Sequence, residues 1–251
     1  MRIKKQDILQ SNLLWNEKNL EYFISTKPFF IRSPIYEWEY SAQSKQNLDM
    51  LWQDFTIPQE NIILLHQTHS SEVVIIHESH KRYEADAAIT QLNWKMLIVL
   101  ASDCVPILLY DTKNHAIGVI HAWWRWLDAE IIKNTLYSLQ EIFWSQPRDI
   151  LCYIGPCISQ ENYEVWADVA EKFLPHFLRS VSKQLQKNNT FLLDVRWIAQ
   201  QQLLKHWVLE KNIEMSQYCT YREKDVFHSY RRSTQKGEVY QWNNALWIML
   251  K

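Results

Sequence analysis

Glycine is nearly missing from this chain, which holds 3 glycines and 13 tryptophans among its 251 residues. A globular chain of this length ordinarily contains roughly 18 glycines. Tight turns need residues that tolerate positive φ, and glycine adopts such angles without steric cost. Tryptophan cannot supply this conformation, so a fold with many tight turns is difficult to build from this composition.

The remaining composition is that of a soluble globular protein with a full core, since 47% of the residues are hydrophobic and 22% are charged. The formal charge of -1 argues against a general nucleic-acid or anionic-membrane binder, so we expect a small-molecule partner. The longest apolar segments, 96–101 and 105–110, are too short to cross a bilayer. No apolar segment follows the basic N-terminus, so we expect no secretory signal. Four unpatterned cysteines indicate reduced thiols and a cytoplasmic location.

No repeat or flexible linker divides the chain, and we expect one domain over residues 1–251. Apolar or alternating segments predict strands at 62–66, 72–76, 87–90, 96–101, 107–110, 116–121, 150–154, 191–193 and 245–250. Helical periodicity predicts helices at 43–55, 127–143, 165–177 and 195–208. The strands gather in the middle of the chain, so we expect an α/β (α+β) fold without the regular alternation of a doubly wound sheet or barrel.

Reactive side chains concentrate in three segments, each at the end of a predicted strand. These are HQTH at 66–69, SDC at 102–104 and HAWWRW at 121–126. Loops at strand ends display functional groups over a rigid sheet. Two histidines and one cysteine suit Zn²⁺, and three protein ligands leave a fourth position open for water. The spacing alone also fits structural histidines and a small core cysteine.

A wider set of motifs resembles the laccase-domain family, which is also described as multicopper polyphenol oxidase-like, as purine nucleoside phosphorylase and as peptidoglycan editing factor. The resemblance runs from about His66 to Arg232. It rests on HQTH (66–69), EADAAIT (84–90), ASDCVPILL (101–109), HAWWRWL (121–127), IGPCI (154–158), YEV (163–165), LDVR (193–196) and SYRR (229–232).

The resemblance implies that His69, Cys104 and His121 bind zinc or copper. It also implies a layered sandwich of mixed β-sheets with helices outside, similar to the deamidase domain of cytotoxic necrotizing factor. The implied activities are phosphorolysis of adenosine, inosine, guanosine or methylthioadenosine and hydrolytic deamination of adenosine. Cys104, His121 and Arg125 are the catalytic candidates, with Arg125 suited to phosphate recognition.

The chain departs from the family where glycine is usual. The family's third motif usually reads HAGWRGL, so Trp123 and Trp126 replace glycines, whereas Trp124 matches the motif. Other tryptophans that stand where relatives commonly carry glycine are Trp94, Trp166, Trp197 and Trp207. Indoles beside a metal ligand would overfill the pocket. We hypothesise that the source lineage reads UGA as glycine; the alternative is a diverged, inactive relative.

Further candidates have competing structural interpretations. Arg125 and the pair Arg231 and Arg232 suit phosphate or carboxylate, but arginines also serve as surface or capping residues. Cys157 either lines the pocket or is an inert buried thiol, and no second cysteine pair supports a metal site at Cys152 and Cys157.

His66 either orients the site or is a structural, hydrogen-bonded histidine. For Asp86, hydrogen bonding to the backbone in a turn is favoured over catalysis.

Three function classes remain open. The first is the metal-dependent purine nucleoside phosphorylase and adenosine deaminase. The second is an amidohydrolase that edits cell-wall precursors, with Cys104 as nucleophile and His121 as base. The third is a zinc- or copper-binding protein whose pocket is blocked by tryptophan.

Overall fold

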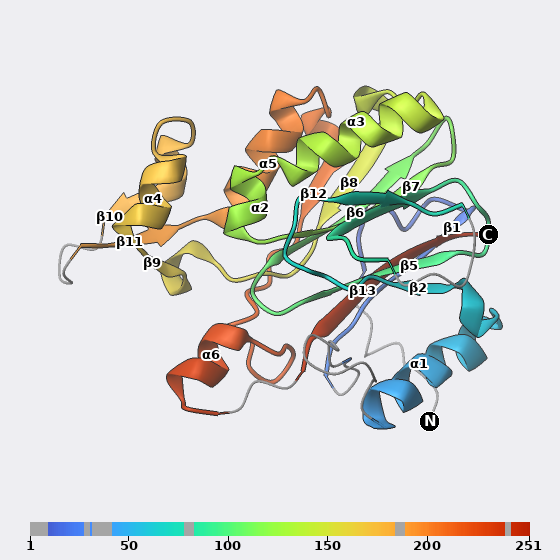
Figure 1. Ribbon diagram of the computed structural model, residues 1–251, viewed down its shortest axis with the longest axis horizontal. Coiled ribbons are helices and arrows are strands. Elements are labelled where there is room, and N and C mark those ends of the chain that lie inside the picture. The colour runs from blue at the N-terminus through green and yellow to red at the C-terminus, as the bar shows by residue number, and fades with distance from the viewer. Residues whose placement is uncertain (1–9, 28–30, 32–41, 78–82, 184–188, 239–241) are drawn as a thin grey trace.

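Two mixed β-sheets face each other at the centre of the protein (Figure 1). The computed structural model describes residues 10–27, 31, 42–77, 83–183, 189–238 and 242–251. In spatial order, the larger sheet consists of β12 (Ile213–Met215), β8 (Ile150–Ile154), β6 (Val105–Asp111), β7 (Ile117–Ala122), β4 (Ala87–Thr90) and β3 (Val73–Ile75). The smaller sheet consists of β1 (Leu20–Ile24), β13 (Asn244–Leu250), β5 (Met96–Ala101) and β2 (Ile62–Leu64). Each sheet combines parallel and antiparallel pairs, as the family resemblance implies.

Continuous apolar segments form the central strands because these strands are buried on both faces. In β5, Leu97 and Val99 enter the core between the two sheets. Met96, Ile98 and Leu100, which alternate with them, enter a second core on the other face of the smaller sheet. An apolar residue is therefore needed at every position of this strand.

Helices cover the outer faces of both sheets, which gives the protein four layers (Figure 1). Side chains of α1 (Ala42–Phe55), such as Leu48 and Phe55, pack against the outer core of the smaller sheet. The larger sheet is covered by α2 (Trp124–Asp128), α3 (Ile131–Phe143) and α5 (Val195–Lys205). Buried Ile132, Leu136, Leu139 and Phe143 form the apolar stripe expected of an amphipathic α3.

A smaller layer extends from one side of the sandwich, at the left of Figure 1. Its sheet has the order β10 (Val181–Lys183), β11 (Thr190–Leu193) and β9 (Glu164–Trp166), with α4 (Ala167–Phe173) packed beside it. The remaining helix, α6 (Tyr230–Gln235), precedes the final strand. Short 3₁₀ turns occur at Gln59–Asn61, Pro147–Asp149, Gln160–Asn162, Leu178–Ser180 and Glu210–Asn212.

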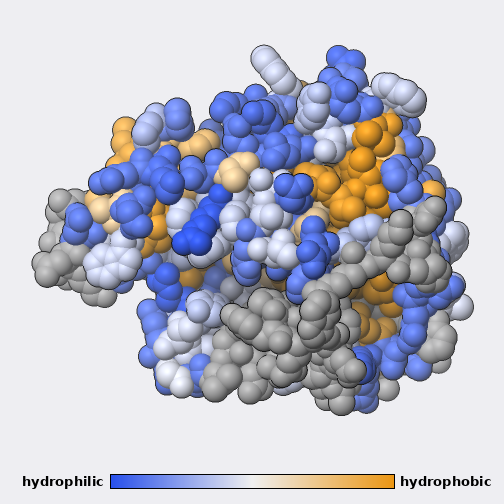
Figure 2. Space-filling view, in the orientation of Figure 1, coloured by the Kyte–Doolittle hydropathy of each residue, from blue (hydrophilic) through white to orange (hydrophobic). Residues whose placement is uncertain are grey.

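Hydrophobic surface gathers beside α3 on the face shown in Figure 2. One edge strand of the larger sheet, β3, is half-buried at all three of its residues.

Among the described residues, no helix is long and apolar enough to cross a membrane.

Three of the predicted helices are wrong in extent. The predicted helix over 195–208 ends at Lys205 as α5, before the left-handed Trp207. The predicted helix over 127–143 is divided into α2 and α3, because Glu130 adopts a left-handed conformation with φ of 56°. The predicted helix over 165–177 begins as strand β9 and becomes α4 only at Ala167. The sequence analysis also misses the short or edge strands β1, β9, β10 and β12, whose apolar patterns are weak.

Replacing Gly155 with alanine should destabilise the fold. An added Cβ would meet Leu246 Cδ2 and would lie 3.0 Å from Pro106 Cγ. Overpacking of this kind costs about 1–3 kcal/mol, and we expect Gly155→Ala to lower the free energy of unfolding by that amount in urea titrations. The control is Gly237→Asn, because Gly237 has open space and a left-handed φ that asparagine tolerates. Equal stability of Gly155→Ala and the parent would contradict this packing.

Candidate functional site

The pairing of β6 with β7 brings Cys104 and His121 to the same end of the larger sheet. Val105 pairs with Ala122, and Pro106 pairs with His121. Cys104 directly precedes β6, and His121 is the penultimate residue of β7. Two of the three predicted metal ligands are thus neighbours through strand register.

His69 reaches this end of the sheet on the loop between β2 and β3. The Gln67 side chain holds the loop, since its Nε2 donates to Leu100 O at 2.8 Å and its Oε1 accepts from the Leu100 N–H at 2.8 Å. His69 itself has a left-handed φ of 63°. Its ring centroid lies 5.8 Å from that of His121, in an edge-on arrangement. Backbone strain of this kind is often kept at functional sites.

Asp86 orients the His121 ring from within the core. Its Oδ1 lies 2.8 Å from His121 Nδ1, and neither side chain is more than 5% exposed. Its Oδ2 accepts the backbone N–H of Ser70 at 2.6 Å, so one carboxylate connects the His69 loop with β7. Asp86 does bind a backbone N–H, but the predicted contact within a turn is wrong, because the donor, Ser70, lies 16 residues away. The sequence analysis missed its contact with His121, which leaves His121 Nε2 as the nitrogen facing away from Asp86.

A second buried carboxylate, Asp103, anchors a distant part of the chain over the site. It accepts hydrogen bonds from Thr220 Oγ1 at 2.6 Å, from Ser229 Oγ at 3.0 Å and from the Arg231 backbone N–H at 2.7 Å. Burial raises the pKa of Asp103, and these three donors oppose that rise. Sequence analysis gave this residue no role, although a charged residue between two apolar strands is a signal that could have found it.

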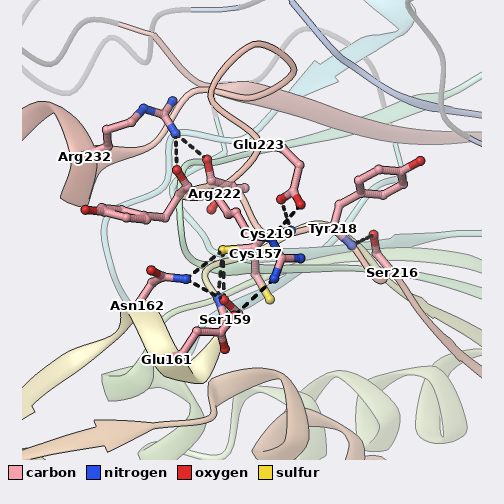
Figure 3. A network of polar contacts seen from close by, with 12 residues as sticks. Cys157, Ser159, Glu161, Asn162, Ser216, Tyr218, Cys219, Arg222, Glu223 and Arg232 are labelled. Carbon is pink, nitrogen blue, oxygen red and sulfur yellow. Dashed lines mark hydrogen bonds and ion pairs between the residues drawn. The ribbon is translucent and has the colours of Figure 1, made fainter.

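The arginine pair of the SYRR motif has two separate roles. Arg232 donates to the carbonyl oxygens of Thr220 and Tyr221, both at 2.7 Å, and so holds the backbone (Figure 3). The Arg231 guanidinium donates through Nη2 to Glu164 O at 2.9 Å and lies 5.2 Å from the Tyr163 ring centroid. Tyr163 in turn accepts a hydrogen bond from Trp123 Nε1 at 3.1 Å. Arg231 is therefore the member of this pair that lies beside Tyr163, next to the indole of Trp123.

Arg125 lies on the exposed side of α2, above two indole rings. Its guanidinium carbon is 5.0 Å from the ring centroids of both Trp123 and Trp124. Burial lowers the pKa of His69, and the nearby positive charges of His121 and Arg125 lower it further. His69 is thereby favoured in the neutral form that binds metal ions.

The surroundings of Cys104 disfavour its thiolate. Burial is the first cause of its raised pKa, and the negative charges of Asp103 and Asp86 add to it. A cysteine in such surroundings is a weak nucleophile unless a positive charge lies beside it.

The donor chemistry suits zinc or copper, but the side chains do not form a closed site. In the part of the chain that the structure describes, no group of three His, Cys, Asp or Glu side chains could hold a metal ion as it stands. Two imidazoles and a thiol are nevertheless suitable ligands. The carboxylate on His121 Nδ1 is the usual support of a metal-binding histidine. Coordination by all three side chains would require them to move together.

Indole rings occupy the space around His69. The rings of Trp123 and Trp126 have centroids 5.9 Å and 5.8 Å from the His69 ring. Trp126 Nε1 is buried and, among the described residues, has no hydrogen-bond partner. The site is therefore filled by side chains on its α2 side.

The remaining candidate residues make contacts that hold the fold together. Cys157 is fully buried and accepts a hydrogen bond from Arg196 Nε at 3.3 Å. Cys152 lies in the core at β8, so the pair gives no metal site. His66 bridges to Glu84 through its backbone, and within the described residues its buried Nδ1 has no hydrogen-bond partner.

The chain is similar to known proteins both in sequence and in fold. The family described as multi-copper polyphenol oxidoreductase laccase matches residues 39–246. A purine nucleoside phosphorylase of Haemophilus influenzae is 31% identical over 198 residues, which cover 78% of this chain and 78% of that protein. One of Bacteroides thetaiotaomicron is 28% identical over 250 residues, which cover 91% and 92%. The crystal structure of the Bacillus licheniformis hypothetical protein YfiH has a TM-score of 0.83 at 20% identity, covering 92% of this chain and 93% of that chain. These matches confirm the predicted mixed α/β fold, while the likeness to the deamidase domain stays a prediction.

Replacing Asp86 with asparagine should release the orientation of His121. The amide is of similar size but carries no charge, so it holds the Nδ1–H form of the ring less firmly. Loss of such a support typically costs about 10–100-fold in metal affinity or activity. Nitrogen NMR of His121 should show a smaller share of the Nδ1–H form. Asp128→Asn, at an exposed ion pair with Lys172, is the control. An unchanged His121 spectrum would contradict the assignment.

Proposed function

Because the chain belongs to the family described as multi-copper polyphenol oxidoreductase laccase, we propose that it is a purine nucleoside phosphorylase that also deaminates adenosine. In this proposal His69, Cys104 and His121 hold Zn²⁺ or Cu²⁺, and Arg125 holds phosphate. Adenosine, inosine, guanosine and methylthioadenosine are its substrates. All four cysteines are free thiols, in keeping with work in the cytoplasm.

The observation that carries this proposal is the convergence of donors at one end of the larger sheet. His121 is oriented by the buried carboxylate of Asp86, and the His69 ring lies 5.8 Å from it. Arg125 contributes positive charge within electrostatic reach of His69. The proximity of these histidines to Arg125 supports a site in which the proposed metal ligands and the proposed phosphate-binding arginine act on one nucleoside.

In phosphorolysis, a phosphate oxygen bonds to C1′ of the ribose while the bond from C1′ to the purine nitrogen breaks. Positive charge develops on the ribose, and the departing purine takes up a proton. Arg125 positions the phosphate for this attack, because a planar guanidinium matches two phosphate oxygens at once. Arg231, beside Tyr163, is the second cation close to this space.

Deamination of adenosine uses the same site with water in place of phosphate. Zinc held by His69, Cys104 and His121 would lower the pKa of a bound water, and addition of that water at C6 of the purine would release the amino group as ammonia. Asp86 holds His121 by Nδ1, so Nε2 is the nitrogen that would bind the ion. Phosphate is not consumed in this reaction, which separates the role of Arg125 from that of the metal ligands.

A second candidate is an amidohydrolase with Cys104 as nucleophile and His121 as base. The buried contact of His121 with Asp86 favours it, because nucleophile, base and orienting carboxylate form the usual series in such enzymes. The raised pKa of Cys104 weighs against an amidohydrolase. If the protein were an amidohydrolase, Cys104→Ala would abolish amide hydrolysis in metal-free protein.

A pocket blocked by Trp123 and Trp126 would instead leave a metal-binding protein without turnover.

Metal retention should depend jointly on His69, Cys104 and His121. Removing one of three ligands from an open site forfeits a large share of the affinity, roughly tenfold or more. We expect each alanine variant to lose most of its zinc or copper during dialysis, as measured by plasma mass spectrometry. His77→Ala, at an exposed residue outside the motifs, is the control. Equal metal content in Cys104→Ala and the parent would refute this ligand set.

Phosphorolysis should depend on Arg125 more than deamination does. We expect Arg125→Ala to raise the KM for phosphate roughly tenfold or more, because a charge-assisted hydrogen bond is lost. Ammonia release from adenosine without phosphate should change little. Arg148→Ala, at a largely exposed arginine, is the matched control. The assays should use metal-loaded protein, both as printed and as Trp123→Gly/Trp126→Gly. An unchanged phosphate KM in a turning-over Arg125→Ala enzyme would remove Arg125 from the phosphate site.

A further inference from the structure

Three tryptophans adopt backbone angles that suit glycine. Trp94, Trp144 and Trp207 have φ of 62°, 53° and 68°. In this conformation the Cβ of an L-residue lies too close to the following carbonyl oxygen, and a bulky residue found there is an outlier. They make up three of the nine non-glycine residues with positive φ in the described part of the chain. Tryptophan is therefore far more frequent among these positive-φ residues than in the whole chain, where 13 of 251 residues are tryptophan.

Trp207 occupies a helix-terminating motif in which glycine is the usual residue. After α5, the Trp207 N–H donates to Leu204 O at 3.1 Å, and the Val208 N–H donates to Leu203 O at 3.1 Å. This pair of bonds defines a Schellman motif, whose left-handed residue is ordinarily glycine. Buried Val208 and Leu203 supply the apolar contact that accompanies the motif. The sequence from Leu203 to Val208 therefore requires a left-handed residue at position 207.

Trp144 and Trp94 also lie where the surrounding chain imposes the turn. Trp144 ends α3, and its N–H donates to Leu139 O. Trp94 follows Asn93 and donates its N–H to Leu250 O at 2.7 Å. An asparagine followed by glycine is a strongly favoured turn dipeptide. Each turn is held by backbone hydrogen bonds that do not involve the indole.

The side chains at these turns contribute little burial. Trp94, Trp144 and Trp207 are 49%, 77% and 81% exposed. Trp247 differs in burial and in backbone, since it is fully buried in β13, stacks on Phe23 and meets Phe55 edge-on. The chain thus contains core tryptophans in ordinary conformations and exposed tryptophans in conformations suited to glycine.

Trp123 and Trp126 show a related mismatch at the candidate site. The extended backbone of Trp123 at the N-cap of α2 fits any residue, so the mismatch there lies in the ring and not in the backbone. Trp126 buries its indole N–H without a partner among the described residues, as Trp247 also does, so its position against His69 is what sets it apart from that core tryptophan. Both rings lie against His69.

We propose that the source organism makes this protein with glycine at positions 94, 123, 126, 144 and 207, because it translates one codon, UGA, as glycine where the printed sequence has tryptophan. The two site glycines then leave an open cavity beside His69, bounded by Tyr163 and Arg125, for a planar ligand. This cavity assignment rests on the proposed function. Positions 166 and 197 are not included, because their backbones fit any residue and their rings do not crowd the candidate site: Trp166 is exposed, and the Trp197 ring lies against Phe177.

Peptide sequencing by mass spectrometry of the protein purified from its source organism tests the proposal directly. Glycine at all five positions, with tryptophan retained at 124 and 247, is the expected result. Tryptophan at any of the five overturns the proposal. This measurement depends on no activity, so its outcome is independent of the proposed function.

Stability gives a second test with recombinant protein. Removing the left-handed strain at one position should lower the equilibrium constant of unfolding roughly fivefold to thirtyfold. The greater chain entropy of glycine in the unfolded state should raise the same constant roughly twofold to fivefold. At mid-range values, Trp94→Gly/Trp144→Gly/Trp207→Gly should therefore unfold with an equilibrium constant roughly tenfold to hundredfold lower than that of the parent. Trp247→Gly, the control, should raise this constant. A triple variant no more stable than the parent overturns the proposal for these positions.

Turnover tests the cavity. Trp123→Gly/Trp126→Gly should raise kcat/KM for adenosine phosphorolysis at least roughly tenfold, whereas Trp15→Gly should not. Equal turnover in the parent and the double variant overturns the cavity. Failure of the proposed function gives a different result. Mass spectrometry then finds glycine at these positions in the native protein, but neither the parent nor any variant turns over a nucleoside.

Discussion

The antiparallel pairing of β6 with β7 determines what the candidate site can do. Their register places the start of β6 beside the end of β7, so Cys104 and His121 meet at one end of the larger sheet. A shift of one residue would turn His121 to the opposite face of the sheet. The register is secured because every residue of both strands is buried, and their apolar side chains enter the cores on both faces of the sheet.

Two buried carboxylates then attach the surrounding loops to this sheet end. Asp86 joins the His69 loop to His121, and Asp103 joins the start of β6 to the segment that carries Thr220, Ser229 and Arg231. Burying a carboxylate is costly unless hydrogen bonds compensate it. Each of these carboxylates receives several short hydrogen bonds, so the same contacts that repay desolvation also hold the site residues in place.

Chemistry and access at this site depend on different residues. The donors come from strand ends and a strained loop, whereas the side chains at the start of α2 fill the space around His69. Indoles at 123 and 126 preserve the donor arrangement while they occupy this space. A metal-binding protein and a nucleoside-cleaving enzyme can therefore share the same strands and differ only in the residues at the start of one helix.

The sequence by itself determined the central strands, the three reactive segments and the shortage of glycine, because apolar runs, motifs and composition are local properties. The tertiary structure alone decided the rest. It showed that Asp86 orients His121 across 35 residues, that Asp103 holds Arg231 across 128, and that Arg231 rather than Arg232 lies beside Tyr163. It also divided the predicted helix 127–143 at Glu130 and showed which tryptophans have left-handed φ. Such features depend on strand register and on hydrogen bonds between distant segments, which local periodicity does not encode.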